Sequence, residues 1–337
     1  MELDEEQEEV VSFNGNTLCI SGPGSGKTRI LTEKARRVFN SGESLLCLTF
    51  TRSAAKEMQS RIPGIPASTI HSFCCGLVGW KEPLGDPGAG YQYLLHRVIW
   101  MKDRPRFQNI LIDEVQDLNP EEIDVALSLV GDKIFAVGDP YQSIYGFQGA
   151  LGPKVITLFK KVGCKPFEIH NNYRSCSSIV NRLNRIYDRK LVSKKVKDTG
   201  ITTVLCRTND DVFLVSKFLE KEGIPHTLRL SVEHYDSKEK AILGGSKNLW
   251  VMTSHQSKGL EFDRVILFSW FPDIDQEEEM RVYYVSVARA SKEFIEVFDL
   301  EELKRRLNLG VPPESSAGLP PSPPGPVSRR ACNQGVS

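Results

Sequence analysis

A glycine-rich loop near the start of this 337-residue sequence limits its fold more than any other feature. The loop SGPGSGKT follows the apolar run TLCI and precedes a segment with apolar residues at helical spacing. Gly22, Gly24 and Gly26 let backbone N–H groups point inward around a phosphate. Lys27 is expected to reach the β- and γ-phosphates, and the Thr28 hydroxyl to bind Mg²⁺. Strand, loop and helix therefore predict an α/β nucleotide-binding domain.

Short apolar runs alternate with helical segments along the rest of the chain. These runs cover residues 17–20, 44–50, 109–112, 133–137, 166–169, 201–206, 226–230, 249–253 and 264–268. Apolar strands separated by helices are typical of parallel sheets covered on both faces. We expect two tandem α/β domains, residues 1–150 and 151–309, followed by a Pro/Ser-rich tail, residues 310–337, that we expect to be disordered.

Composition excludes some classes of protein and leaves others open. Lys and Arg number 43 and Asp and Glu 43, so any nucleic acid must be attracted by local basic surface and not by net charge. Twelve basic residues against two acidic ones between positions 154 and 197 are a candidate for such a surface, or else a solvated face balanced by acids elsewhere. The acidic N-terminus and the absence of a long apolar segment predict a cytoplasmic chain without a membrane helix. The spacing of the eight cysteines predicts neither a disulfide nor a zinc site.

A second chemical signal is the segment QNILIDEVQD, in which an apolar strand ends in two adjacent carboxylates. Asp113 is placed to hold the Mg²⁺ shell, and Glu114 to orient and deprotonate an attacking water. An acidic turn after a strand is common by itself. Together with the phosphate loop, it predicts an enzyme that hydrolyses nucleoside triphosphates.

Five segments then occur in a fixed order: DEVQD, VGDPYQSIYGFQGA, NNYRS, VMTSHQSKGLEFDRV and VYYVSVARA. In this order they resemble the UvrD/Rep family of superfamily 1 DNA helicases. With LDEEQ and the glycine loop before them, the matching motifs run from Leu3 to Ala290. The chain is therefore similar to a compact member of that family. The resemblance implies two RecA-like domains of the P-loop NTPase class, with ATP and Mg²⁺ in the cleft between them.

The resemblance also implies roles for residues of the nucleotide site. Gln142 would sense the γ-phosphate and the attacking water, while Arg174 and Arg289 would reach the γ-phosphate from the second domain. The rest of the implied set is Gln7 on the edge of adenine, Tyr173 on its ring, Glu261 on the ribose, and Pro23, Ser25 and Arg29 within the loop motif. The alternative for Gln7 is a solvated, acidic helix start.

A track for single-stranded DNA is implied across both domains. Its residues are Thr51, Arg52, His71, Phe73, Tyr145 and Phe147 on the first domain, and Thr253, His255, Ser257 and Lys258 on the second. Hydroxyls, amides and a lysine suit phosphate contacts that do not depend on base sequence, and aromatic rings can stack on bases. Phe73 has a core position as its alternative. The family's Tyr-x-Trp-Arg reads Tyr145, Gly146, Phe147 and Gln148 here, which reduces the stacking surface and removes a cation.

These motifs predict an ATP-driven translocase and DNA helicase, 3′ to 5′ by resemblance, that binds single strands and single/double-strand junctions. The alternative is a DNA-stimulated ATPase switch or clamp that does not unwind productively. Only 39 residues (74–112) and 77 residues (176–252) separate the motifs where larger relatives carry inserted domains. We expect at most a small insertion near residues 74–108, read as a loop with a short helix around 91–101. Processive unwinding would then need several copies or a protein partner, for which the Pro-rich tail is a candidate contact.

Overall fold

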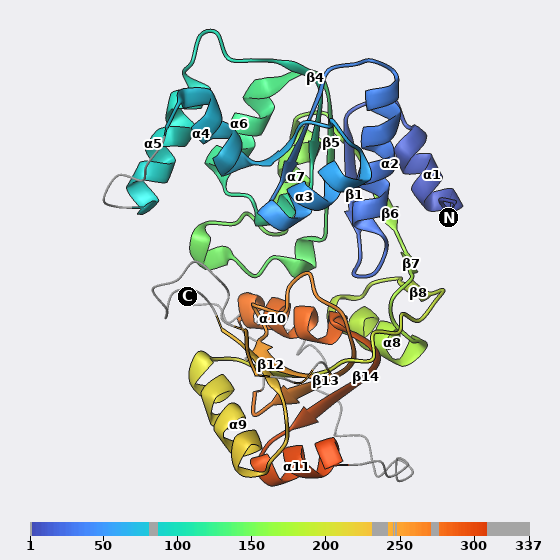
Figure 1. Cartoon of the computed structure of the whole chain (residues 1–337). Coiled ribbons are helices and arrows are strands. Elements are labelled where there is room, and N and C mark those ends of the chain that lie inside the picture. The colour runs from blue at the N-terminus through green and yellow to red at the C-terminus, as the bar shows by residue number, and fades with distance from the viewer. Residues whose placement is uncertain are drawn as a thin grey trace, which may run out of the picture.

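The computed structural model describes residues 2–80, 87–230, 242–244, 246, 248–270 and 276–308. The predicted tail, residues 310–337, lies outside this part of the chain. Two six-stranded sheets, each covered by helices, follow one another along the sequence and are stacked end to end in Figure 1. The prediction of an α/β fold with two parallel-sheet units is confirmed.

The first sheet has the strand order β3-β2-β4-β5-β1-β6, and all of its neighbouring strands are parallel. Its strands are β1 (Thr17–Ser21), β2 (Leu45–Thr49), β3 (Ala67–Thr69), β4 (Phe107–Ile112), β5 (Val130–Gly138) and β6 (Lys165–Ile169). The carboxyl ends of parallel strands share one edge of a sheet, where ligands of such folds bind. The loops that follow β1, β4 and β5 therefore meet at that edge.

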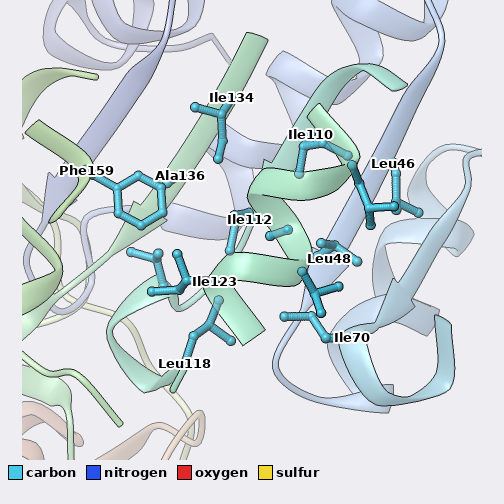
Figure 2. Packing of buried hydrophobic residues seen from close by; sticks show 14 of the residues in the cluster. Leu46, Leu48, Ile70, Ile110, Ile112, Leu118, Ile123, Ile134, Ala136 and Phe159 are labelled. Carbon is cyan, nitrogen blue, oxygen red and sulfur yellow. The ribbon is translucent and has the colours of Figure 1, made fainter. Parts of the chain in front are cut away.

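Helices cover both faces of the first sheet because its strands are apolar on both sides. On β4, Ile110 and Ile112 pack in one cluster while Leu111, which lies between them, packs in the other. Figure 2 shows the first of these clusters. One face carries α4 (Ile70–Val78), α5 (Pro87–Ile99), α6 (Pro120–Leu129) and α7 (Lys154–Lys161); the other carries α1 (Glu5–Ser12), α2 (Lys27–Asn40) and α3 (Arg52–Arg61).

The expected domain boundary at residue 150 is wrong. Strand β6 pairs in parallel with β1, with Phe167 opposite Cys19, and Val155 and Phe159 of α7 are buried in the core of the first sheet. The first α/β unit therefore continues to Ile169. A strand's sequence shows that it is apolar but does not show which sheet edge it joins, and this explains the error.

The short helix expected around residues 91–101 is present as α5, but it begins earlier, at Pro87. Helix α5 is a 13-residue element whose Leu94, Leu95 and Val98 are buried in the core beside α6. These three positions lie on one face of a helix. Pro87, Gly88 and Gly90 favour a loop by themselves, whereas burial of this face stabilises a helix that includes them.

The second sheet has the order β11-β10-β12-β9-β13-β14, and among its described pairs only β10 and β11 run antiparallel. Its strands are β9 (Thr202–Cys206), β10 (Thr227–Arg229), β11 (Ile242–Gly244), β12 (Leu249–Thr253), β13 (Phe262–Phe268) and β14 (Ala290–Val297). We did not predict β14, because it directly follows the SVARA motif and has charged residues within it. Two short strands, β7 (Asn171–Asn172) and β8 (Val192–Ser193), pair between the sheets.

Helices α8 (Ser177–Tyr187) and α10 (Glu277–Ala288) pack on one face of this sheet. Helices α9 (Asn209–Lys221) and α11 (Leu300–Asn308) pack on the other. Figure 1 shows α8 and α10 on the side that faces the first unit. No helix of the described residues has the length and apolar composition to cross a bilayer.

Candidate active site

The glycine loop lies between β1 and α2 in the conformation that the sequence predicts. Gly24 and Gly26 have φ of 68° and 83°, a region that favours glycine, and Gly26 caps the N-terminus of α2. The Lys27 ammonium donates to the Gly22 carbonyl at 3.3 Å, and the Ser25 hydroxyl donates to the same carbonyl at 2.7 Å. The loop thus presents a lysine and the N–H groups of a helix start, an arrangement that favours anions.

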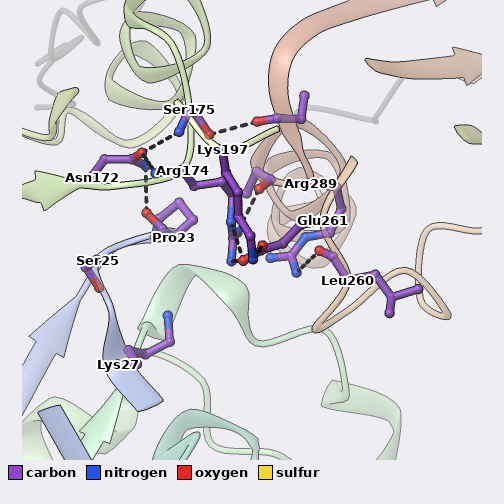
Figure 3. Close-up of polar contacts among 12 residues, drawn as sticks. Pro23, Ser25, Lys27, Asn172, Arg174, Ser175, Lys197, Leu260, Glu261 and Arg289 are labelled. Atoms are coloured by element: carbon purple, nitrogen blue, oxygen red, sulfur yellow. Dashed lines mark hydrogen bonds and ion pairs between the residues drawn. The ribbon is translucent and has the colours of Figure 1, made fainter. Parts of the chain in front are cut away.

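A segment that follows the first sheet packs directly on this loop. The Asn172 side chain donates to the Pro23 carbonyl at 2.7 Å, and the Tyr173 backbone N–H donates to the Gly24 carbonyl at 2.8 Å. A Cβ at Gly24 would lie 2.6 Å from the Arg174 Cβ. Glycine is therefore required at position 24 both for its φ and for this close approach, which brings Arg174 toward the loop (Figure 3).

Gln7 is buried, with a relative exposure of 1%, so the alternative of a solvated helix start is wrong. Its Nε2 donates to the Ser25 carbonyl at 2.8 Å, and its Oε1 accepts from the Asp4 backbone at 3.3 Å. The Tyr173 hydroxyl donates to the carboxylate of the same Asp4. Gln7 thus supports the phosphate loop from behind, and its contact with adenine stays a prediction.

Asp113 and Glu114 follow β4, as predicted, and their electrostatic surroundings differ. Burial and the charge of Glu114 raise the pKa of Asp113 to about 7. Burial acts in the same direction on Glu114, but the charges of Lys27 and Lys258 outweigh it and lower that pKa. Glu114 is therefore the more readily ionised member of the pair, as a general base must be.

Gln116 holds this glutamate and was missed by the sequence analysis. Its Nε2 donates to Glu114 Oε2 at 2.7 Å, and its Oε1 accepts from the Asp139 backbone at 3.0 Å. A Cβ at Gly138 would lie 2.2 Å from that Oε1, so the end of β5 has to be glycine. The signal was present in the DEVQD motif, where an amide two residues after a carboxylate is a candidate for orienting it.

The second unit contributes two arginines to the same site. Arg289 is 2% exposed, and its Nη2 donates to Gln142 Oε1 at 2.8 Å across the two units. Arg174 Nη2 lies 2.7 Å from Glu261 Oε1, and its Nη1 donates to the Ala288 carbonyl at 3.0 Å. Figure 3 shows both guanidinium groups beside Glu261.

Lys197 is a further residue that the sequence analysis did not assign to the site. Its ammonium pairs with the second carboxylate oxygen of Glu261, so Arg174 and Lys197 share one carboxylate. Their positive charges lower the pKa of Glu261, although burial acts in the opposite direction. Glu261 thus orients Arg174, and its predicted ribose contact stays a prediction.

A cavity of about 620 Å³ lies between the units and brings most of the predicted nucleotide residues together. Its lining includes Pro23, Gly24, Ser25, Gly26, Lys27, Thr28, Arg29, Glu114, Gln142, Tyr173, Arg174, Lys197, Lys258, Glu261 and Arg289. The predicted residues Gln7, Gly22 and Asp113 lie outside this lining. The site therefore has a phosphate loop, a carboxylate and cations from two separate sheets.

Two family models match the sequence. Residues 7–148 match an AAA domain, and residues 231–297 match a UvrD-like helicase C-terminal domain. DNA helicase II of Salmonella typhimurium is 24% identical over 302 residues, which cover 59% of this chain and 42% of that protein. DNA helicase IV of Escherichia coli is 26% identical, with 67% of this chain and 39% of the relative covered. Together, the two family models and these relatives support a UvrD/Rep-like helicase.

A solved structure supports the fold of this UvrD/Rep-like chain. A Pif1 helicase, from a study of DNA unwinding at forked double-stranded DNA, aligns with a TM-score of 0.50 and 16% identity. The alignment covers 90% of this chain and 94% of that one. The UvrD/Rep-like chain spans about two fifths of the length of the curated helicases above.

Part of the predicted DNA set of this UvrD/Rep-like chain lies on accessible surface of the first unit. Arg52 and His71 line a second cavity of about 230 Å³, together with Tyr91 of α5, while Thr51 caps α3 nearby. Phe147 is 69% exposed, and its ring lies 6.2 Å from that of His255 on the second unit. Tyr145 stacks on Phe50 with ring centroids 5.1 Å apart.

Other members of that set are placed differently. The Ser257 side chain is buried and donates to the Ser254 carbonyl at 2.6 Å, and Thr253 is buried where its hydroxyl accepts from the Gln256 backbone at 3.3 Å. Both hydroxyls are buried and shape the turn after β12. The predicted contact of Thr253 and Ser257 with DNA is therefore corrected to this structural role. Phe73 packs against the first core, 6.1 Å from the Phe107 ring, in agreement with its alternative.

Lys258 points into the nucleotide cavity. Its ammonium lies 2.5 Å from Asp117 Oδ2 and donates to the Gln142 carbonyl at 2.8 Å. Burial raises the pKa of Asp117 to about 7, although the charge of Lys258 opposes this. The lysine predicted to bind DNA is thus an ion-pair partner across the two units.

The basic stretch from 154 to 197 does not form one surface. Arg189 is paired with buried Asp139, Arg182 with Glu296, and Lys165 lies over the rings of Phe13 and Phe167. The stretch passes through α7, β6 and α8, which belong to two different sheets. These three charges therefore have separate structural roles.

Proposed function

We propose that this chain is an ATP-hydrolysing translocase of single-stranded DNA and a DNA helicase. The observation that carries the proposal is the hydrogen bond of Arg289 to Gln142 beside the phosphate loop, because a cation from the second unit reaches the nucleotide cavity of the first. Arginines supplied across a cleft stabilise charge on a transferring phosphoryl group. The curated relatives named as DNA helicases support the same conclusion.

In this mechanism each residue has a separate task. Lys27 and the N–H groups of the loop bind the triphosphate. Glu114, held by Gln116, accepts a proton from the attacking water, while Gln142 orients that water. Arg174 and Arg289 stabilise the charge that develops on the γ-phosphoryl group. Because these two arginines belong to the second unit, ATP draws the units together and hydrolysis releases them, which is the stroke of a motor.

The oxygen donors near the phosphate loop fit a Mg²⁺ ion. Thr28 in the first turn of α2 supplies a hydroxyl, and Asp113 supplies a buried carboxyl whose pKa is raised to about 7 by burial and by the charge of Glu114. Hard oxygen ligands suit Mg²⁺, and a nearby dication would favour ionised Asp113. When bound, the ion would neutralise charge on the β- and γ-phosphates.

Single-stranded DNA is proposed to cross both units, over Arg52, His71 and the Phe147–His255 pair. The exposed Phe147 ring can stack on bases of any sequence. Movement 3′ to 5′, binding at single/double-strand junctions and a cytoplasmic location are parts of this proposal. A second candidate function is an ATPase switch that does not unwind DNA. It is favoured by Phe147 and Gln148, which stand where the family has a Trp-Arg pair.

The proposal is tested by following ATP hydrolysis and strand displacement together on duplexes with a 3′ or a 5′ tail. Lys27→Ala provides the inactive control, because it removes the phosphate ligand but no predicted DNA contact. We expect hydrolysis stimulated by single strands and displacement from the 3′ tail, with both activities lost in the variant. Stimulated hydrolysis without displacement would support the switch, and hydrolysis that persists in Lys27→Ala would contradict the assignment of the site.

A further inference from the structure

We propose that Arg189 is a positioning residue for ATP hydrolysis, which acts through Asp139 to fix the orientation of the Gln142 amide. The inference rests on the proposed ATPase function and extends it to a residue outside the five motif segments. Arg189 follows α8 in the second unit, whereas Asp139 and Gln142 follow β5 in the first. The contact therefore joins the two units.

The ion pair is buried. Arg189 Nη1 lies 2.6 Å from Asp139 Oδ1, with side-chain exposures of 9% for the arginine and 0% for the aspartate. A carboxylate without solvent is costly unless a cation and hydrogen bonds compensate its charge. Arg189 is the cation within ion-pair distance of this carboxylate among the described residues.

The other oxygen of the same carboxylate holds the catalytic glutamine. Asp139 Oδ2 accepts from Gln142 Nε2 at 2.8 Å, and Gln142 Oε1 accepts from Arg289 Nη2 at 2.8 Å. An ionised carboxylate only accepts hydrogen bonds, so it selects the NH₂ end of the amide. The carbonyl end is thereby turned to the arginine. A line of hydrogen bonds runs from Arg189 to the arginine that would stabilise the transition state.

Aromatic rings from both units enclose the guanidinium. It lies 5.1 Å from the centroid of Tyr141 in the first unit, and its Nη1 is 3.3 Å from the hydroxyl of Tyr284 in the second. Tyr187 stacks on Tyr141 with ring centroids 4.4 Å apart. This packing fixes Arg189 only when the two units are in contact, so the orientation of Gln142 depends on closure of the cleft.

The experiment is a double-mutant cycle between Arg189→Ala and Gln142→Ala, with kcat for ATP measured at saturating single-stranded DNA. ATP affinity is measured separately with a fluorescent ATP analogue. Lys190→Ala, at the exposed neighbouring position, is the matched control. We expect Arg189→Ala to lower kcat about tenfold and to change ATP affinity less than about threefold. In the Gln142→Ala background the same substitution should have almost no further effect.

A wild-type kcat for Arg189→Ala would overturn the inference. So would independent effects, in which the double variant loses kcat by the product of the two single losses. A loss of affinity with kcat unchanged would overturn it as well. If Arg189→Ala is unfolded at the assay temperature, Arg189→Lys, which keeps the charge, takes its place in the same cycle, and its smaller defect must again disappear beside Gln142→Ala. The proposed ATPase function is contradicted by a different result, namely that the wild-type protein does not hydrolyse ATP.

Discussion

At the scale of single residues, the site depends on a glutamate in an unusual backbone conformation. Glu114 has φ of 48°, in the left-handed region that non-glycine residues seldom occupy. Such a conformation costs on the order of 1 to 3 kcal/mol and persists where surrounding contacts enforce it. Here Asp113 Oδ1 accepts from the Glu114 backbone N–H at 3.0 Å, and Gln116 holds the side chain. This backbone conformation places the Glu114 carboxylate in the nucleotide cavity.

Glu114→Gln should bind ATP but hydrolyse it roughly 10² to 10⁴-fold more slowly, because the amide keeps the shape and cannot accept the proton of water. The rate of phosphate release at saturating single-stranded DNA measures this. Asp124→Asn, on the exposed part of α6, makes the same chemical change away from the site and should leave the rate unchanged. A Glu114→Gln rate within a few-fold of wild type would assign the base to another residue.

Arg289→Ala should lower DNA-stimulated hydrolysis about 10³-fold, the loss typical of a removed arginine finger. The substitution also leaves the Gln142 carbonyl oxygen without its donor at 2.8 Å. Single-turnover hydrolysis separates this effect from product release. Arg305→Ala, at an exposed position of α11, is the control for loss of an arginine. A single-turnover rate equal to that of the control would remove Arg289 from the catalytic set.

At the scale of elements, the ends of β4 and β5 are fitted to one another without spare volume. The Gln116 side chain occupies the space beside Gly138, where a Cβ would lie 2.2 Å from its oxygen and 2.9 Å from Val115 Cγ1. The two strands are paired from Phe107 to Ile112, so neither end can move independently. The register of these strands therefore positions Glu114, the proposed general base.

Gly138→Ala should displace Gln116 and lower the free energy of unfolding by about 1 to 3 kcal/mol, as overpacking in a core does. It should also slow ATP hydrolysis, because Glu114 loses its hydrogen bond. Gly76→Ala in α4 is the matched control, since a Cβ there meets nothing within 4 Å. This control should be neutral or stabilising by about 0.5 to 1 kcal/mol. Chemical denaturation gives both values, and equal stabilities for the two variants would contradict the fit.

Across the whole molecule, the described elements form two α/β units and little else. Among the described residues, the first insertion position adds α5, which packs one face into the core. The described elements between Cys176 and Thr253 are strands of the second sheet, helices packed on it, or β8 of the small β7–β8 pair. An added domain usually needs at least about 50 residues of its own. Surfaces with which to grip a duplex are therefore small in this part of the chain.

We expect the isolated protein to move along single strands but to displace only short duplexes, or to need several copies on one strand. Single-turnover unwinding of duplexes of increasing length, at one protein per substrate and then at excess, measures this. The fraction of duplex unwound should fall steeply with duplex length at one protein per substrate. It should recover when protein is in excess over substrate. Efficient displacement of long duplexes by a monomer would contradict the expectation.

The amino-acid sequence alone was enough to predict the phosphate loop, the carboxylate pair, nine of the strands and the resemblance to UvrD/Rep helicases. These features are local, because a glycine turn, an apolar run or an ordered motif depends on neighbouring residues along the chain. Even the parallel-sheet architecture follows from such runs, since strands buried on both faces are continuously apolar.

Which distant residues meet follows only from the folded structure. Lys258 pairs with Asp117 across 141 positions, and Arg189 pairs with Asp139 across 50. Nothing in the sequence near Lys258 shows that its partner is an acid and not DNA. Likewise, β6 belongs to the first sheet because it pairs with β1 at the edge of that sheet. Pairing energies depend on distance in space and on burial, and both are set only when the two sheets have packed.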